Sequence, residues 1–249
     1  MNETDPIDKS DSSDKSDPSD APPESVILLH GLGRSRLSMW VLGARLRSAG
    51  FETHNFPYSP PTQTLDEIAT DLREFVEKRV AGGRYHFISH SLGGVVIRHG
   101  FKKGYPPRLG RIVMLAPPND TPQLAVALKG NWLFDLISGD SGRRMADPAF
   151  YDSLPVPDVE FGVIAGDRGQ NLTFDAPNDG VVTVEGARLE GMADWTVVRR
   201  THTFLMNSAD AARLCVNFLR SGAFEGKGDA DVSTGMRNPP FASPSQIDR

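Results

Sequence analysis

The chain has 249 residues, enough for one domain with a single buried core. It is 39% hydrophobic, and no apolar run approaches the ~20 residues that a membrane-spanning helix needs, so we expect no stable membrane insertion. The formal charge of −5 is uneven: residues 1–24 carry two lysines and eight acidic residues, which leaves the remainder at +1. With a formal charge this close to zero, the rest of the chain has no strong positive electrostatic potential to attract nucleic acid, so we expect no nucleic-acid partner.

Both ends of the chain have compositions that disfavour folding. Residues 1–24 consist largely of Ser, Asp, Pro and Lys, and they predict a disordered acidic tail because too little apolar surface offsets the entropy of ordering. They lack the apolar core of a secretory signal, which favours a cytoplasmic location. Residues 225–249 predict a flexible C-terminal tail. We therefore expect the folded domain over residues 25–224.

Between these tails, short apolar runs alternate with amphipathic segments. The apolar runs, which predict strands, span residues 25–29, 51–58, 85–88, 111–116, 160–165 and 196–199. The segments with helical spacing span residues 34–49, 65–80, 92–99 and 209–219. Thr64 and Glu67 predict a capping box for the second helix. The alternation predicts a mostly parallel sheet of about six strands flanked by helices.

Residues 119–158 interrupt this rhythm, because they combine aromatic and aliphatic residues with glycines. The segment resembles a small cap or lid inserted beside the edge of the sheet where active sites form. Trp132 and Phe134 are therefore candidates for contact with an acyl chain, together with Met39 and Trp40. The alternative, that the aromatic residues of the insertion simply extend the core, stays open at this stage.

The most informative motif is the segment Phe87–Gly94, in which a strand, a tight turn and a helix follow one another. Such a turn holds its central side chain, here Ser91, in a strained backbone region and exposes the hydroxyl. The motif departs from Gly-x-Ser-x-Gly, because Ser89 occupies the first glycine position while Gly93 keeps the second. Ser91 is the candidate nucleophile, and the alternative is that it only caps the helix.

A serine nucleophile needs an adjacent base, and histidine has a suitable pKa. His202 is the best of the six histidines because it follows the last predicted strand, in a short loop at the correct edge of the sheet. The imidazole needs an acid between the nucleophile and the base in chain order. Asp179, in a turn past the strand at 160–165, is the preferred acid, with Asp167 and Asp175 as alternatives.

A tetrahedral oxyanion needs about two preorganised amide donors. The amide of Leu92, the first residue of the helix after the turn, supplies one candidate. The second is the amide of Leu32, in the loop after the first strand, where Gly31 and Gly33 let the backbone approach a ligand. The single cysteine, Cys215, excludes an internal disulfide and is expected to be a buried structural thiol.

Together these motifs resemble the bacterial lipase and esterase branch of the α/β-hydrolase superfamily. The likeness rests on VILLHGLGRS at 26–35, HFISHSLGG at 86–94, NDGVVTVEGARLEG at 178–191 and THTFLMNS at 201–208. It implies an α/β-hydrolase fold and hydrolysis of a small-molecule or lipid ester through Ser91, Asp179 and His202, without a metal or other cofactor. An acyltransferase or amidase with the same triad, or a non-catalytic binding protein of this fold, remains the alternative.

Overall fold

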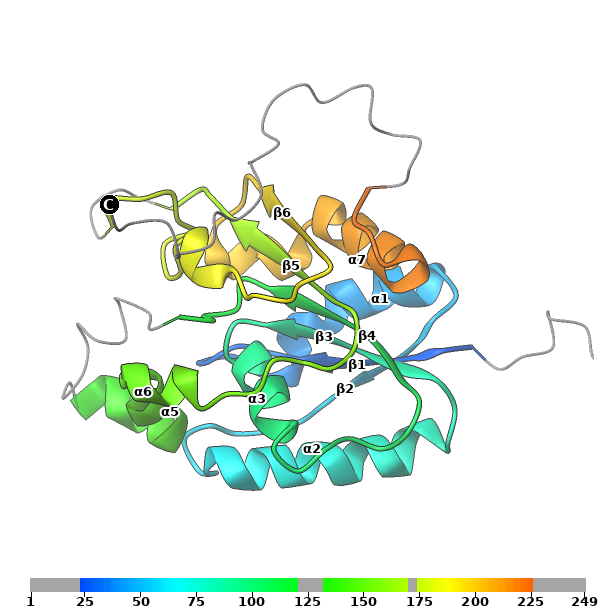
Figure 1. Cartoon of the computed structure of the whole chain (residues 1–249), viewed down its shortest axis with the longest axis horizontal. Helices are drawn as coiled ribbons and strands as arrows, with labels where there is room; N and C mark the ends of the chain where they lie inside the picture. Colours follow the sequence, from blue (N-terminus) through cyan, green and yellow to red (C-terminus); the bar gives the residue numbers. More distant parts are fainter. Residues whose placement is uncertain (1–22, 121–131, 170–173, 226–249) are drawn as a thin grey trace, which may run out of the picture.

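A six-stranded parallel sheet organises the computed structural model, which describes residues 23–120, 132–169 and 174–225, with backbone alone for 132–138. The strand order is β2-β1-β3-β4-β5-β6, and all neighbouring strands run parallel (Figure 1). The strands are β1 Ser25–Leu29, β2 Glu52–Asn55, β3 Tyr85–His90, β4 Leu109–Leu115, β5 Phe161–Gly166 and β6 Asp194–Val198. The prediction of a parallel sheet of about six strands is confirmed.

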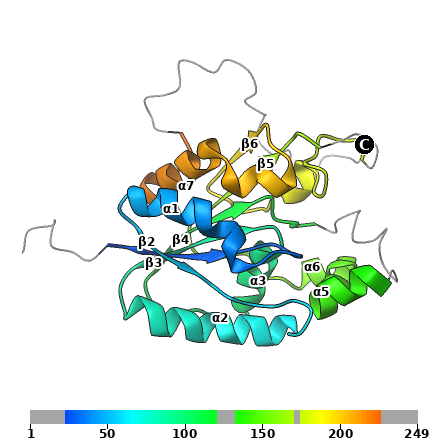
Figure 2. The same cartoon turned by 180° about the vertical axis from the view of Figure 1, so that it is seen from behind.

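Helices cover both faces of the sheet. The α-helices are α1 Trp40–Ser48, α2 Leu65–Val80, α3 Leu92–Gly100, α5 Trp132–Met145, α6 Pro148–Asp152 and α7 Ala209–Ser221. The 3₁₀ turns are η2 Arg36–Met39, η3 Glu185–Ala187 and η4 His202–Asn207. In Figures 1 and 2, α1 and α7 lie on one face and α2 and α3 on the other. No helix of the described ranges is long and apolar enough to cross a membrane.

The central strands separate two hydrophobic clusters. Successive side chains of a strand point to opposite faces, so Ile27 and Phe87, which are register partners, pack on the α2 and α3 side. Val26 and Ile88 pack on the α1 and α7 side. All four side chains are fully buried, which explains why these strands read as continuous apolar runs rather than as alternating patterns.

The capping box predicted for α2 is confirmed. The Glu67 amide donates to Thr64 Oγ1 at 3.2 Å, and the Thr64 amide donates to Glu67 Oε2 at 2.8 Å. The predicted start of the first helix, at residue 34, is too early, because a loop and the turn η2 precede α1. The Glu24 carboxylate, just before β1, lies 2.9 Å from Nε2 of buried His86.

The inserted segment 119–158 contributes α5 and α6 between β4 and β5, while residues 121–131 lie outside the described part of the chain. Phe150 and Tyr151 of α6 are buried in the hydrophobic cluster that holds α2 and α3. The second half of the insertion therefore packs against the core, whereas the side chains of Trp132 and Phe134, which the two alternatives concern, lie outside the described residues. A lid function for the first half is a prediction that these residues do not test.

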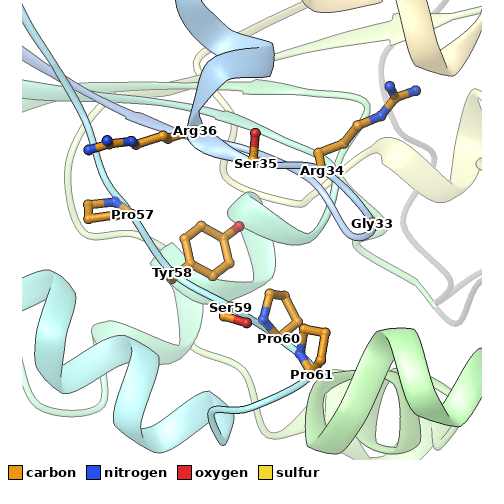
Figure 3. A pocket seen from close by; sticks show the side chains of 9 residues that line it. All are labelled: Gly33, Arg34, Ser35, Arg36, Pro57, Tyr58, Ser59, Pro60 and Pro61. Carbon is orange, nitrogen blue, oxygen red and sulfur yellow. The ribbon is translucent and has the colours of Figure 1, made fainter.

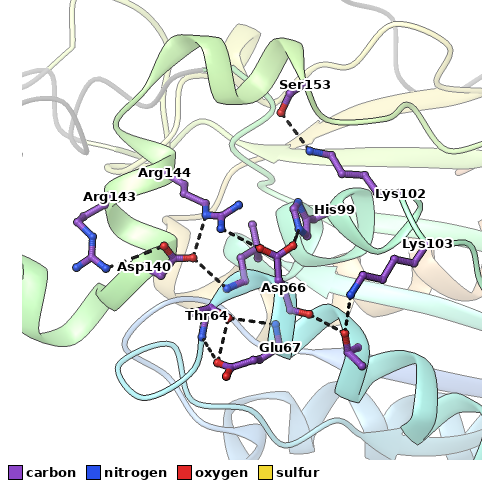
Figure 4. Close-up of polar contacts among 12 residues, drawn as sticks. Thr64, Asp66, Glu67, His99, Lys102, Lys103, Asp140, Arg143, Arg144 and Ser153 are labelled. Atoms are coloured by element: carbon purple, nitrogen blue, oxygen red, sulfur yellow. Dashed lines mark hydrogen bonds and ion pairs between the residues drawn. The ribbon is translucent and has the colours of Figure 1, made fainter.

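Ion pairs attach α5 to the ends of α2 and α3 (Figure 4). Asp66 on α2 contacts His99 Nε2 at 2.7 Å and the Arg144 guanidinium at 2.9 Å. Arg144 Nε also contacts Asp140 at 2.9 Å, and Asp140 accepts the Leu65 amide at 3.2 Å. The His99 hydrogen bond is the main cause that lowers the pKa of Asp66, so this carboxylate is charged at neutral pH.

A kink in α5 brings the insertion against the loop between β2 and α2. Gly139 has φ 55° and ψ −140°, a conformation that favours glycine. A Cβ at this position would lie 2.3 Å from the Pro60 carbonyl oxygen. The α5 backbone thus packs directly on that loop.

Candidate active site

The turn between β3 and α3 has the strained geometry that the sequence predicts. Ser91 adopts φ 51° and ψ −121°, outside the regions that L-residues normally populate. Its amide donates to the Leu115 carbonyl at 2.9 Å, which fixes the turn to β4. A Cβ at Gly93 would lie 2.9 Å from both Cβ and the carbonyl oxygen of Leu29. Glycine is therefore required where α3 crosses β1.

Ser89 shows how the departure from Gly-x-Ser-x-Gly is accommodated. Its side chain is fully buried, and Oγ has no hydrogen-bond partner among the described residues. The hydroxyl faces Gly94, where an added Cβ would lie 3.5 Å from it. A side chain of this size fits, and the unpaired hydroxyl costs about 1–3 kcal/mol of stability.

His202 and Asp179, which the sequence selects as base and acid, are hydrogen-bonded. His202 Nδ1 lies 2.7 Å from Asp179 Oδ2, and the Asp179 side chain is almost fully buried. The other carboxylate oxygen accepts the amides of Val181 and Val182 at 2.9 and 2.8 Å. A carboxylate only accepts hydrogen bonds, so the His202 proton sits on Nδ1 and Nε2 carries a free lone pair. This is the tautomer that a general base requires.

The alternative acids do not contact His202. Asp167 and Asp175 are both exposed, and neither side chain makes a hydrogen bond within the described ranges. A backbone hydrogen bond explains why Asp179 is the acid that contacts His202: the His202 amide donates to the Asp179 carbonyl at 2.9 Å. That backbone contact draws the loop after β6 against the turn that holds Asp179.

Ser91 lies at the same edge of the sheet as this pair, at the end of β3. His90, its neighbour in sequence, contacts His202: the rings are 4.6 Å apart, and His90 Nε2 lies 3.0 Å from the His202 carbonyl oxygen. Ser91 Oγ itself makes no hydrogen bond to the described residues, His202 Nε2 included. Contacts between nucleophile and base often tighten only when substrate is present.

The predicted oxyanion donors flank the serine. Leu92 begins α3 and is fully buried, and the Leu32 backbone follows Gly31 in the loop after β1. A Cβ at Gly31 would lie 3.1 Å from Ser91 Cβ, so this loop runs directly beside the nucleophile. Neither the Leu32 nor the Leu92 amide donates to an acceptor within the described part of the chain. Both amides are therefore available to an anion.

A pocket of about 440 Å³ lies next to this loop, between it and the segment that follows β2 (Figure 3). Its lining residues are Gly33, Arg34, Ser35, Arg36, Pro57, Tyr58, Ser59, Pro60 and Pro61. The Tyr58 ring stacks on His30 at 4.1 Å, and its hydroxyl donates to the His30 carbonyl, which joins the two walls. Burial raises the pKa of Tyr58, so the phenol stays neutral and keeps this bond.

Of the pocket residues chosen from the sequence, Met39 and Trp40 do not line this space. Met39 is fully buried in the hydrophobic cluster below α1, so it offers no surface to a substrate, and that prediction is wrong. Trp40 is 59% exposed and does not line the pocket. The side chains of Trp132 and Phe134 lie outside the described residues. The sequence does not indicate Tyr58 and Pro60 as pocket residues, because only tertiary packing brings their loop against His30 and the loop that follows it.

Among the described residues, no cluster of His, Cys, Asp and Glu could hold a metal ion. The other histidines near the site are buried: burial lowers the pKa of His30 and holds that of His90 well below its usual value. Cys215 is buried in the core, as expected, and burial raises its pKa. Within these ranges Ser91, His202 and Asp179 lie at the same edge of the sheet, and they stay the predicted catalytic residues.

The model of the alpha/beta hydrolase family matches residues 26–233. The chain belongs to this family. A search of curated proteins found no match. Among solved structures, this alpha/beta hydrolase is similar to the mature Bacillus licheniformis lipase BlEst2, with a TM-score of 0.67, 18% identity, and coverage of 84% of this chain and 95% of the lipase.

Two further similar structures have related names. The metagenomic carboxyl esterase MGS0156 is 19% identical, with a TM-score of 0.61 and coverage of 73% of this chain and 65% of the esterase. The Paleococcus ferrophilus monoacylglycerol lipase is 16% identical, with a TM-score of 0.58 and coverage of 81% and 96%. At these identities the likeness shows the fold, and the predicted α/β-hydrolase fold is confirmed.

Proposed function

We propose that this alpha/beta hydrolase cleaves carboxylic esters through an acyl-enzyme intermediate, with Ser91 as nucleophile, His202 as base and Asp179 as the acid that orients it. The substrate is a small-molecule or lipid ester. The observation that carries the proposal is the 2.7 Å hydrogen bond from His202 Nδ1 to Asp179, at the sheet edge that also holds Ser91. Proteins of similar fold that are named lipases or carboxyl esterases support an ester substrate.

In the first step, Ser91 Oγ bonds to the ester carbonyl carbon while its proton passes to His202 Nε2. The tetrahedral intermediate then breaks the bond to the alcohol oxygen, and the alcohol leaves with the proton from His202. Water attacks the acyl-serine and gives a proton to His202, which returns it to Ser91 Oγ as the acid departs. Asp179 keeps its charge throughout and stabilises the imidazolium.

The Leu32 and Leu92 amides hold the oxyanion in both steps. Each donor of this kind lowers the barrier by roughly 3–4 kcal/mol when it is preorganised. Because the donors are main-chain groups, the side chain at position 32 should affect the shape of the pocket more than the chemistry.

The proposal is tested with Ser91→Ala and short p-nitrophenyl esters. We expect a folded protein that has lost at least about 10⁴-fold in turnover, since removal of the nucleophile leaves only binding and the oxyanion donors. Labelling of the parent, and not of the variant, by a fluorophosphonate separates the hydrolase from a non-catalytic binding protein. Equal turnover in both proteins would refute the proposal. Product analysis with a competing alcohol or amine distinguishes hydrolysis from acyl transfer.

A further inference from the structure

His90 makes the contact that joins the nucleophile turn to the loop of the base. It is the last residue of β3, it is almost fully buried, and its Nε2 lies 3.0 Å from the His202 carbonyl oxygen. A carbonyl oxygen only accepts, so His90 Nε2 carries a proton and donates. Within the described ranges, no other hydrogen bond links residues 85–100 to residues 201–208.

The His90 ring lies close to both His202 and the loop after β1. It packs at 4.6 Å and 49° against the ring of His202. A Cβ at Gly31 would lie only 2.8 Å from His90 Nδ1, so the backbone of the loop after β1 lies close to this nitrogen. Nδ1 has no hydrogen-bond partner among the described residues, which leaves Nε2 as the nitrogen that holds the ring.

The electrostatic surroundings keep this imidazole neutral. Burial is the largest cause that lowers the pKa of His90. The charge that His202 carries once protonated, the Arg34 guanidinium and the His30 ring act in the same direction, while the hydrogen bond to the His202 carbonyl acts against them. A neutral His90 adds no charge beside His202 when that residue takes up a proton. It acts as a fixed dipolar donor rather than as a second base.

His202 is consequently held at three points. Its amide donates to the Asp179 carbonyl at 2.9 Å, its Nδ1 donates to the Asp179 carboxylate at 2.7 Å, and its carbonyl accepts from His90. The first two contacts fix His202 relative to Asp179 alone. Among the hydrogen bonds of the described residues, the third alone joins it to the strand that carries Ser91.

We propose that His90 is a positioning residue, whose Nε2–H donates to the His202 carbonyl and sets the distance from the base to Ser91 Oγ. This inference rests on the proposed hydrolase function. A displacement of about 1 Å at a reacting group costs on the order of 10²-fold in rate, so loss of the contact should lower kcat and leave KM nearly unchanged.

The test compares three substitutions at position 90. The amide nitrogen of Gln lies as many bonds from Cα as Nε2 of His, so His90→Gln should keep kcat within about fivefold of the parent. His90→Asn is polar but one carbon too short, and His90→Leu has no donor. Both should lose about 10²-fold in kcat with KM within about twofold, and react more slowly with a fluorophosphonate.

Tyr105→Phe is the matched control. It removes one hydrogen bond of similar length, from the Tyr105 hydroxyl to the Ile97 carbonyl at 3.0 Å, near the C-terminal end of α3 and away from Ser91 at its N-terminal end. We expect it to lose stability but keep kcat. Parent-level kcat in His90→Asn, an equal loss in His90→Gln, or a similar loss in Tyr105→Phe would each overturn the positioning role. If Ser91→Ala kept the activity, the hydrolase proposal would fail instead.

Discussion

Replacement of Asp179 by Asn tests the predicted acid with almost no change in shape. In the structure one carboxylate oxygen accepts two amides, those of Val181 and Val182, and the other faces His202 Nδ1. The oxygen of an Asn side chain will stay with the two amide donors, which places its NH₂ against Nδ1. Nδ1 must then accept, so the His202 proton moves to Nε2. An imidazole protonated on Nε2 cannot take the proton of Ser91.

We therefore expect Asp179→Asn to lower kcat/KM for a p-nitrophenyl ester by about 10⁴-fold, which corresponds to roughly 5 kcal/mol of transition-state stabilisation. The melting temperature should stay close to that of the parent, because the backbone contacts remain. Asp167→Asn is the matched control, since Asp167 is exposed and does not contact His202, and it should retain parent activity. A loss below tenfold in Asp179→Asn, or an equal loss in Asp167→Asn, would refute the assigned role.

Two further predictions concern stability. Gly93→Ala places a methyl group 2.9 Å from the carbonyl oxygen and Cβ of Leu29, so the free energy of unfolding in urea should fall by about 1–3 kcal/mol. An unchanged urea midpoint of unfolding would contradict the close contact between α3 and β1. Because burial lowers the pKa of His90 in the folded state, the unfolded chain binds its proton first as pH falls through about 6.5, and stability should decrease between pH 7 and 5. His90→Gln should reduce the slope of unfolding free energy against pH in this range by up to about 1.4 kcal/mol per pH unit. An identical slope in the parent and the variant would contradict this.

Local chemistry made much of the fold predictable. The capping box of α2 and the turn at Ser91 depend on residues a few positions apart, so their geometry follows from sequence spacing. The pairing of His202 with Asp179 could be predicted because parallel strands place their carboxyl ends at one edge, which limits the candidates.

The missed features depend on how distant segments pack. Met39 lies close in sequence to the loop after β1, but it belongs to the 3₁₀ turn η2 and its side chain lies in the core, a direction that hydrophobicity alone does not reveal. The partnership of His90 with the loop 112 residues later requires the order of the sheet, in which β6 lies three strands from β3. The side chains of His90 and Ser91 point in different directions although the two residues are adjacent. His90 nevertheless contacts the predicted base, because its Nε2 donates to the backbone carbonyl of His202.

The kink at Gly139 connects the inserted segment to the pocket. Its backbone lies against Pro60, which is also part of the wall of the 440 Å³ pocket. A change in the length or tilt of α5 should therefore displace Pro60 and alter the wall of this pocket. The inserted segment and the pocket are coupled through a direct contact between two stretches of backbone, with no side chain of residue 139 between them.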